Sequence, residues 1–475
     1  MIFLQPKIHW QGAKDGMAVS EMPLINYSVA ALWKVFGKQE GIYRLFNYLI
    51  FICSIFILFT TLQRAGNSGM VSFFCVSLIL TSPLLVYYAY NFLADVPAFA
   101  LATMGFCFLF SFYKSKKLVY FYLALLVSTI AVLIKASAVF PLAFMCFFVI
   151  IELFQLNNKF KTEKLFSNKI IPSLALLIAF ILIALWYNFA KAYNLNSQNA
   201  VFLLDILPVW NMNEGDVFKN LSVLLSDLLP VFFNRPVLLL FVLAIGFVSV
   251  NFKLLNAFLK YAFVFSALFF ISFICLFFQV FDVHDYYLIN MMIFPIIILF
   301  CTSHILIVKN YIPQSQLFLR LLILIVFLNA FYSAAYYRVR TIKDDKLCYW
   351  YPFISKFEKN KIDEEMWNHK QTMGKLPEIQ NELRKMGIKR NEIFISVPDN
   401  SPNISLYFLD QKGFNVPGED FAEDTLWKSR TNFDKAAYLV MNDSMFKHTV
   451  SFKNIEPKLK RILKREHVEV YKINS

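Results

Sequence analysis

Long apolar runs separated by short polar breaks dominate the first two thirds of the chain. A membrane-spanning helix needs roughly 20 apolar residues, and about ten runs approach that length. They lie near residues 46–63, 71–88, 96–112, 118–134, 137–154, 170–189, 237–252, 261–280, 286–307 and 318–336. The pattern predicts a polytopic α-helical membrane protein with about ten visible transmembrane helices.

The pattern changes after Thr341 to a charged, mixed sequence in which helical and strand signals alternate. We expect helices at Lys375–Met386, Asn403–Asp410 and Ile455–Arg465, the last one basic, and strands at Glu392–Val397, Ala437–Met441 and His467–Ile473. Such alternation is typical of a small α/β domain with a largely parallel sheet. We therefore expect a transmembrane domain at 1–337 and a soluble extracytoplasmic domain at 338–475, without a glycine-rich loop for a nucleotide.

The segment 190–236 is apolar but is interrupted by prolines and aspartates, and it looks too polar to span. It is either a set of amphipathic pieces at the membrane interface or over a cavity, or a simple tether.

Composition supports the membrane class: 58% of residues are hydrophobic, only 16% are charged, and mean hydropathy is +0.54. The net charge of +14 does not indicate nucleic acid, because most lysines lie in breaks between apolar runs or in the C-terminal quarter. Six cysteines lie inside apolar runs without CxxC spacing, so neither a metal site nor a disulfide framework is indicated.

Cationic loops are retained in the cytoplasm, and alternate loops agree on the orientation. The predicted cytoplasmic set holds Arg64, Lys114, Lys116, Lys117, Lys159, Lys161, Lys164, Lys169, Lys253, Lys260 and Lys309. The outward set holds residues 1–45, 89–95, the turn around Lys135, 190–236, 281–285 and everything after 337. Residues 1–45 are themselves basic and would resist export, so we hypothesise that an upstream helix is missing from the sequence as given.

Charged residues at membrane depth are costly and indicate function by default. Glu21 could instead be an ordinary carboxylate at a helix start, and Asp95 a simple helix cap. Lys135 interrupts AVLIKASAVF, and FDVHDYYLI brings together Asp282, His284, Asp285, Tyr286 and Tyr287, whose tyrosines alone could form an aromatic belt.

All these sites are predicted on one face of the membrane, which favours a common site over coincidence. Carboxylates, a lysine and a histidine suit transfer from an anionic lipid-linked donor, where a carboxylate takes the acceptor proton and cations stabilise the departing phosphate. This chemistry requires no cofactor, and the residues leave open whether a divalent cation takes part.

The order SEMPLINYSVAALWKVFG, YYAYNFLADVPAFAL, AVLIKASAVFPL and VHDYYLI resembles the GT-C glycosyltransferases, in the group of bacterial relatives of protein mannosyltransferases and the lipid A aminoarabinose transferase. The likeness covers roughly residues 1–310, and NISLYFLDQKGF is similar to the outer domain of these relatives.

The resemblance implies inverting transfer of a sugar from a polyprenyl-phosphate carrier to a lipid, glycan or protein acceptor outside a bacterial inner membrane. It implies catalytic roles for Glu21 and Asp95, binding of the carrier phosphate by Lys135 and His284, and a cavity lined by Asp285, Tyr287 and Tyr88. The family's principal catalytic aspartate precedes the segment matching Phe3–Gly12, and Asp15 does not match its context. Whether the chain as given is active is therefore left open.

Two other classes remain from the residues alone. A transporter or flippase of lipid-linked saccharides would also bury charges, but near the bilayer midplane and often within internal repeats. A polysaccharide polymerase or ligase would differ in substrate rather than in membrane organisation.

Overall fold

The computed structural model describes residues 19, 21–196, 206–281, 284–310, 316–341, 373–401, 404–422 and 433–474. The chain forms two compact units. One comprises Glu21–Trp186 and Asp205–Ile354; the other comprises Met1–Ser20, Tyr187–Leu204 and Ser355–Ser475. Each is described by itself.

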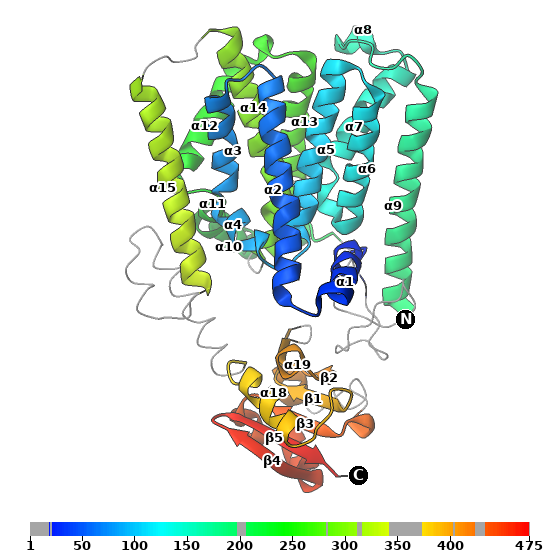
Figure 1. The fold of residues 1–475 in the computed structure, drawn as a ribbon, viewed down its shortest axis with the longest axis vertical. Coiled ribbons are helices and arrows are strands. Elements are labelled where there is room, and N and C mark those ends of the chain that lie inside the picture. Colours follow the sequence, from blue (N-terminus) through cyan, green and yellow to red (C-terminus); the bar gives the residue numbers. More distant parts are fainter. Residues whose placement is uncertain are drawn as a thin grey trace. The chain divides into compact units, whose positions relative to one another are not determined.

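The described residues between 21 and 341 are mainly helical (Figure 1). The helices are α1 Leu24–Phe36, α2 Glu40–Arg64, α3 Gly69–Leu80, α4 Pro83–Ala89, α5 Asp95–Ser115, α6 Leu118–Ile134, α7 Phe140–Leu153, α8 Asn157–Phe160, α9 Ile170–Asn196, α10 Glu214–Val223, α11 Leu229–Phe232, α12 Arg235–Val250, α13 Ala257–Leu276, α14 Ile293–Val308 and α15 Gln316–Thr341. A 3₁₀ segment, η6 (Asp285–Met292), leads directly into α14.

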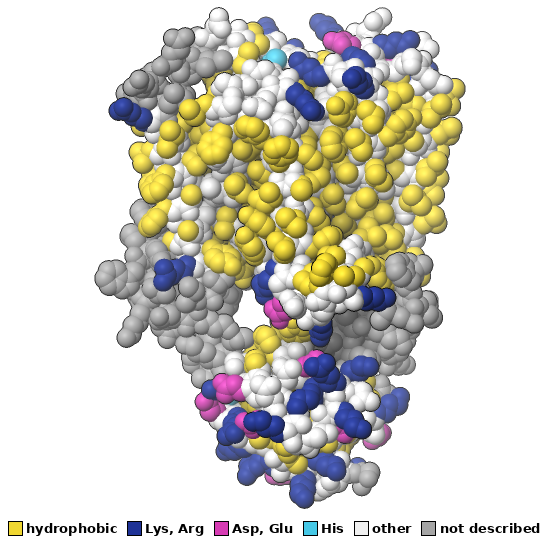
Figure 2. Space-filling view, in the orientation of Figure 1, with side chains coloured by type: hydrophobic (Ala, Val, Ile, Leu, Met, Phe, Trp, Pro, Cys, Tyr) yellow, Lys and Arg dark blue, Asp and Glu magenta, His cyan; other side chains and the backbone are white. Residues whose placement is uncertain are grey.

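Each predicted apolar run overlaps a helix, but the count of ten spans is not confirmed. Among the described residues, six helices are long and apolar enough to cross a membrane, or eight if two bent pairs each form one span. The runs 118–134 and 137–154 give helices of 17 and 14 residues, which are shorter than a full span. Figure 2 shows hydrophobic side chains covering the sides of this unit and lysines and arginines above them.

Alternate connections lie at opposite ends of the helical unit. Figure 1 places α8 at one end and α1, α4, α10 and α11 at the other. The loop charges predict this separation of alternate connections to opposite ends. The assignment of one end to the cytoplasm remains a prediction.

The described part of the segment 190–236 is partly helical. Helix α9 continues to Asn196, and Glu214–Phe232 is helical and bends by 97° against α12. The first half of VFLLDILPVW, residues 201–205, lies outside the described residues. The position of these pieces at a membrane interface remains a prediction.

Helix α5 is the most buried of the candidate spans, and it packs closely against α6. A Cβ atom added to Gly105 would lie 2.1 Å from Ser128 Oγ, so a larger residue at this position would displace that hydroxyl. On its other side, Phe106 and Phe110 each contact the rings of Phe258 and Phe300, with centroids 5.4–5.7 Å apart. The ends of α5 and α6 are therefore held at fixed positions.

The run 71–88 is broken into α3 and α4, which meet at an angle of 68°. Pro83 has no N–H to continue the helical pattern of α3. The carbonyl of Thr81 instead accepts hydrogen bonds from Asn329 Nδ2 at 2.8 Å and from the hydroxyl of Ser333, both on α15. The buried side chain of Asn329 thus donates a hydrogen bond to the backbone where the helix is interrupted. The sequence predicts one continuous span over this run.

The C-terminal residues form a five-stranded sheet in the order β2-β1-β3-β5-β4. The strands are β1 Ile393–Val397, β2 Lys412–Asn415, β3 Tyr438–Met441, β4 Leu459–Arg465 and β5 Val468–Ile473, with helices α18 Leu376–Lys385, α19 Ile404–Leu409, α20 Gly418–Ala422 and α22 Val450–Ile455. The predicted α/β character is confirmed, as are the helices near 375–386 and 403–410 and the strands near 392–397, 437–441 and 467–473.

Two predictions for this domain are wrong. The sheet is mixed, because β3–β5 and β4–β5 are antiparallel while β1–β2 and β1–β3 are parallel. The stretch predicted as a basic helix at Ile455–Arg465 contains strand β4 instead. Pro457 lies in a short 3₁₀ turn that precedes the strand, and pairing with β5 then determines the conformation.

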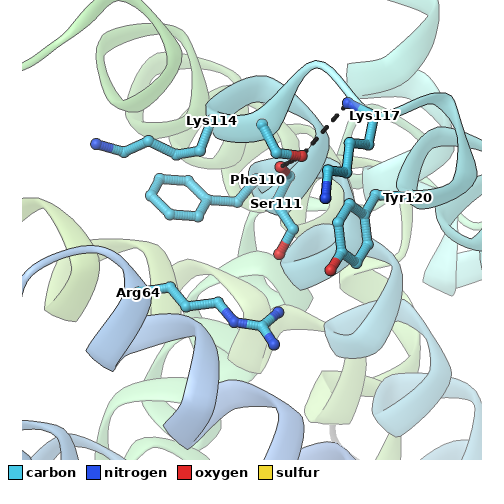
Figure 3. A pocket seen from close by; sticks show the side chains of 7 residues that line it. Arg64, Phe110, Ser111, Lys114, Lys117 and Tyr120 are labelled. Atoms are coloured by element: carbon cyan, nitrogen blue, oxygen red, sulfur yellow. Dashed lines mark hydrogen bonds between the residues drawn. The ribbon is translucent and has the colours of Figure 1, made fainter.

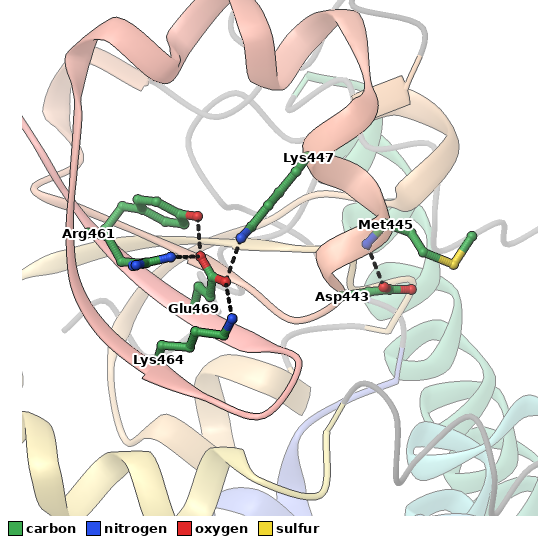
Figure 4. Close-up of polar contacts among 7 residues, drawn as sticks. Asp443, Met445, Lys447, Arg461, Lys464 and Glu469 are labelled. Atoms are coloured by element: carbon green, nitrogen blue, oxygen red, sulfur yellow. Dashed lines mark hydrogen bonds and ion pairs between the residues drawn. The ribbon is translucent and has the colours of Figure 1, made fainter.

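Glu469 on β5 is a buried charge of this domain, with a side chain 1% exposed. Lys447 Nζ and the Tyr471 hydroxyl donate to it at 2.5 Å, and Arg461 Nη1 and Lys464 Nζ lie 3.5 and 3.6 Å away (Figure 4). Burial alone would raise the pKa of this carboxyl, but hydrogen bonds from Lys447 and Tyr471 hold the pKa below its usual range.

Candidate active site

Lys135 lies where α6 ends, and its ammonium group contacts two carboxylates. The residue takes an extended conformation (φ −152°, ψ 116°), and the chain then turns through Ala136–Ala138 into α7. Nζ lies 2.7 Å from Glu21 Oε1 and 3.2 Å from Asp95 Oδ1. Three charges far apart in sequence therefore form one cluster, which we call the Lys135 centre.

The start of α1 positions Glu21. The backbone N–H of Met22 donates to the carbonyl of Leu133 at 2.9 Å, next to the end of α6. Ile25 and Val29 of α1 are buried against small residues of α5 and α6, namely Ala98, Ala102 and Ala131. Small residues let helices approach closely, so α1 holds the carboxylate of Glu21 beside Lys135.

Asp95 is the first residue of α5, and its side chain is 2% exposed. The helix N-terminus and Lys135 both favour a negative charge there. The structure shows no side-chain capping bond at this helix start, and the Lys135 ammonium group, 3.2 Å from Oδ1, is the charged partner of the carboxylate. Asp95 is thus not a simple cap, because its carboxylate is paired with Lys135.

The charge on Lys135 is fixed by its surroundings. Burial alone would lower the pKa of the ammonium group, but the carboxylates of Asp95 and Glu21 outweigh burial and raise the pKa well above its ordinary value. Lys135 therefore remains a cation throughout the physiological pH range.

Aromatic rings of the η6 segment surround the same ammonium group. Lys135 Nζ lies 5.3 Å from the ring centroid of Tyr287 and 5.7 Å from that of Tyr286. The imidazole of His284 lies 5.0 Å from Tyr286 and 5.7 Å from Tyr287, centroid to centroid. Ring faces attract cations, so these residues form an aromatic wall of the Lys135 centre.

A second group of charges forms around Asp285. The hydroxyl of Tyr88 donates to Oδ1 at 2.5 Å, and Arg340 Nη1 donates to Oδ2 at 2.9 Å. Arg340 also donates to the hydroxyl of Tyr336 at 3.1 Å and lies 4.1 Å from the ring centroid of Tyr87. We call Tyr88, Asp285 and Arg340 the Asp285 centre.

Tyr286 connects the two centres. Its ring centroid lies 6.0 Å from that of Tyr88 and 5.7 Å from Lys135 Nζ. In addition, Asn290 Nδ2 donates to Ser137 Oγ at 2.8 Å, which ties η6 to the turn after Lys135. Helices α4, α5, α6 and α15 and segment η6 therefore contribute to one continuous site.

The structure brings together all seven residues predicted for the site: Glu21, Tyr88, Asp95, Lys135, His284, Asp285 and Tyr287. Asp282 lies outside the described residues. Sequence reasoning missed Arg340 because it was assigned to the soluble part of the chain. Its signal was a cation at the predicted outward end of an apolar run, where cationic residues are unexpected.

The described residues do not contain a group of three or more histidine, cysteine, aspartate or glutamate side chains arranged to hold a metal ion.

Comparison with known proteins agrees with the resemblance seen in the motifs. The family described as dolichyl-phosphate-mannose-protein mannosyltransferase matches residues 20–189, which include Glu21, Asp95 and Lys135. No curated protein matches the sequence significantly.

The fold is shared with solved membrane glycosyltransferases. ArnT from Cupriavidus metallidurans bound to undecaprenyl phosphate is 11% identical, with a TM-score of 0.52 over 95% of this chain and 87% of that chain. The apo state of that protein gives a TM-score of 0.50 with the same identity and coverage. The apo oligosaccharyltransferase from Archaeoglobus fulgidus is 10% identical, with a TM-score of 0.50 over 92% of this chain and 63% of that chain. The expected GT-C-like fold is confirmed.

Proposed function

We propose that this multi-pass membrane protein, which has a GT-C-like fold and matches the protein mannosyltransferase family over residues 20–189, transfers a sugar from a polyprenyl-phosphate carrier to an acceptor. The observation that carries the proposal is the Lys135 centre, which unites two carboxylates with a permanent cation inside the matched region. The solved ArnT complex with undecaprenyl phosphate supports this class of donor.

The proposed reaction needs a proton acceptor and a cation for the leaving group. The acceptor hydroxyl attacks the anomeric carbon, the bond from that carbon to the carrier-phosphate oxygen breaks, and the phosphate leaves with the electron pair. Asp95, a buried carboxylate beside Lys135, takes the hydroxyl proton. Lys135, supported by His284, stabilises the charge on the phosphate. Attack opposite the leaving group inverts the anomeric configuration.

Of the two carboxylates that contact Lys135, that of Glu21 is the one that a bound ligand can replace. Its side chain is 36% exposed, whereas that of Asp95 is 2% exposed. We assign Glu21 the role of holding Lys135 in place until the carrier phosphate replaces its carboxylate. Asp95 stays beside Lys135 when this exchange occurs.

The compartment follows from the loop charges. The site lies at the end of the helical unit that carries the outward set of connections, so we assign it to the extracytoplasmic face of a bacterial inner membrane. The acceptor is a lipid, a glycan or a protein on that side.

Reconstitution into proteoliposomes tests the proposal. The protein is incubated with a panel of undecaprenyl-phosphate sugars and a cell-envelope extract, and release of undecaprenyl phosphate is measured. We expect extract-dependent release that falls by about 10²-fold or more in Asp95→Asn and Lys135→Met. Lys159→Met, on exposed helix α8, is the matched control and should retain the rate. Movement of intact donor across the bilayer without release would instead identify a transporter.

A further inference from the structure

Three cations lie at the ends of α2, α5 and α6 that are far from the Lys135 centre. Arg64 is the last residue of α2, Lys114 lies in the last turn of α5, and Lys117 is the N-cap of α6. Asp95 and Lys135 occupy the other ends of α5 and α6. With a rise of 1.5 Å per residue, α5 separates the two regions by roughly 28 Å.

These cations line a pocket of about 280 Å³, which also includes Phe110, Ser111, Ser115 and Tyr120. In Figure 3, Arg64 enters from α2, while Lys117 and Tyr120 point toward the same space from the start of α6. Lys114 points away from these side chains. Three cations and no carboxylate are therefore among the lining residues.

The acidic residue Glu163 forms its ion pair with Lys116 and not with a cation that lines the pocket. Glu163 is 2.9 Å from Lys116, whose ammonium also lies 4.6 Å from the ring centroid of Tyr113. Within the described ranges, no ion pair involves Arg64, Lys114 or Lys117. Arg64 and Lys117, which point toward the same space, are thus available to an anion.

The hydroxyl groups indicate which side chains would contact that anion. Ser111 donates to the carbonyl of Cys107 at 2.9 Å, and Ser115 donates to that of Ser111 at 2.7 Å, so both protons are used within α5. The donors left for a ligand are the guanidinium of Arg64, the ammonium of Lys117 and the hydroxyl of Tyr120. The N-terminus of the 17-residue helix α6 adds partial positive charge beside them.

We propose that this pocket binds a phosphate group, carried either by the headgroup of an anionic lipid or by free phosphate. A guanidinium fork matches the oxygen geometry of phosphate, and an ammonium adds a second charge. Basic pockets between membrane helices suit anionic headgroups. The inference is independent of the proposed sugar transfer, because no residue of the pocket belongs to the Lys135 or Asp285 centre.

Native mass spectrometry of the full chain in detergent tests the pocket in two arms. One arm adds dioleoyl phosphatidylglycerol and the other adds inorganic phosphate. The Arg64→Gln/Lys117→Gln variant should bind the ligand on the order of 30-fold more weakly than wild type, because each cation near an anionic lipid contributes roughly a five-fold factor. Lys159→Gln, an exposed cation outside the pocket, should bind like wild type.

The arm that shows this loss identifies the source of the phosphate group, and loss in either arm supports the site. Equal binding by wild type and the double variant in both arms would overturn the proposal. Unchanged thermal unfolding of the double variant in phosphate-free detergent provides the folding control, since both substituted side chains are exposed.

Discussion

Glu21 and Lys135 are 114 residues apart in the sequence, and their side chains meet at 2.7 Å. This contact joins the segment before α1 to the end of α6, and the same ammonium group reaches Asp95 at the start of α5. Taken singly, the carboxylates of Glu21 and Asp95 each have an ordinary structural explanation at the start of a helix. The convergence of Glu21 and Asp95 on one half-buried lysine is what supports a chemical role.

The first prediction concerns the electrostatic balance of the Lys135 centre. Lys135→Met leaves Asp95 buried without its cation, and removing one partner of a buried ion pair typically costs about 3–5 kcal/mol. We expect a clear fall in the Tm of the detergent-solubilised protein. Adding Asp95→Asn should restore much of the loss, because no buried charge then remains. A double variant less stable than Lys135→Met would show that the ion pair does not set the stability of this site.

The second prediction concerns Arg340. Its Nη1 atom donates to both Asp285 and Tyr336, and its guanidinium lies over Tyr87. Arg340→Lys keeps the charge but loses the planar group, so sugar transfer should fall on the order of ten-fold. Arg320→Lys, an exposed position on the same helix, should retain the wild-type rate. Equal rates in both variants would place Arg340 outside the working site.

The third prediction concerns the break between α3 and α4. Asn329→Leu removes the donor to Thr81 and leaves a buried carbonyl with fewer partners. Hydrogen bonds between membrane helices contribute about 1–2 kcal/mol, so the free energy of unfolding should fall by a similar amount. Leu324→Ala, at an exposed position of α15, should have a smaller effect. The comparison is made by thermal unfolding in one detergent.

The fourth prediction concerns acid pH and Glu469. Because the pKa of this carboxyl is lowered in the folded state, its ion pairs stabilise the domain above the ordinary pKa of glutamate, and the contribution is lost as pH falls through the lowered value. Glu469→Gln should therefore be less stable than wild type at pH 7, and the difference should shrink at acid pH. Hydrogen–deuterium exchange of β5 in the full chain, corrected for intrinsic rates, measures it. A constant difference across pH would exclude this linkage.

Residues with strong local signals were predictable from the sequence. Apolar length identifies the helices, and the cost of charge at membrane depth identified Glu21, Asp95 and Lys135. The features that were missed depend on distant partners. Strand β4 exists because it pairs with β5, and the break at Thr81 is satisfied by Asn329 on α15. Arg340 belongs to the site only because α15 brings it beside Asp285.

The most direct test of the central claim is the affinity of the reconstituted protein for undecaprenyl phosphate itself. If Lys135 binds the carrier phosphate and Glu21 competes for it, Lys135→Met should weaken binding by at least about ten-fold, while Glu21→Gln should strengthen it. Wild-type affinity in Lys135→Met, or weaker binding in Glu21→Gln, would contradict the account.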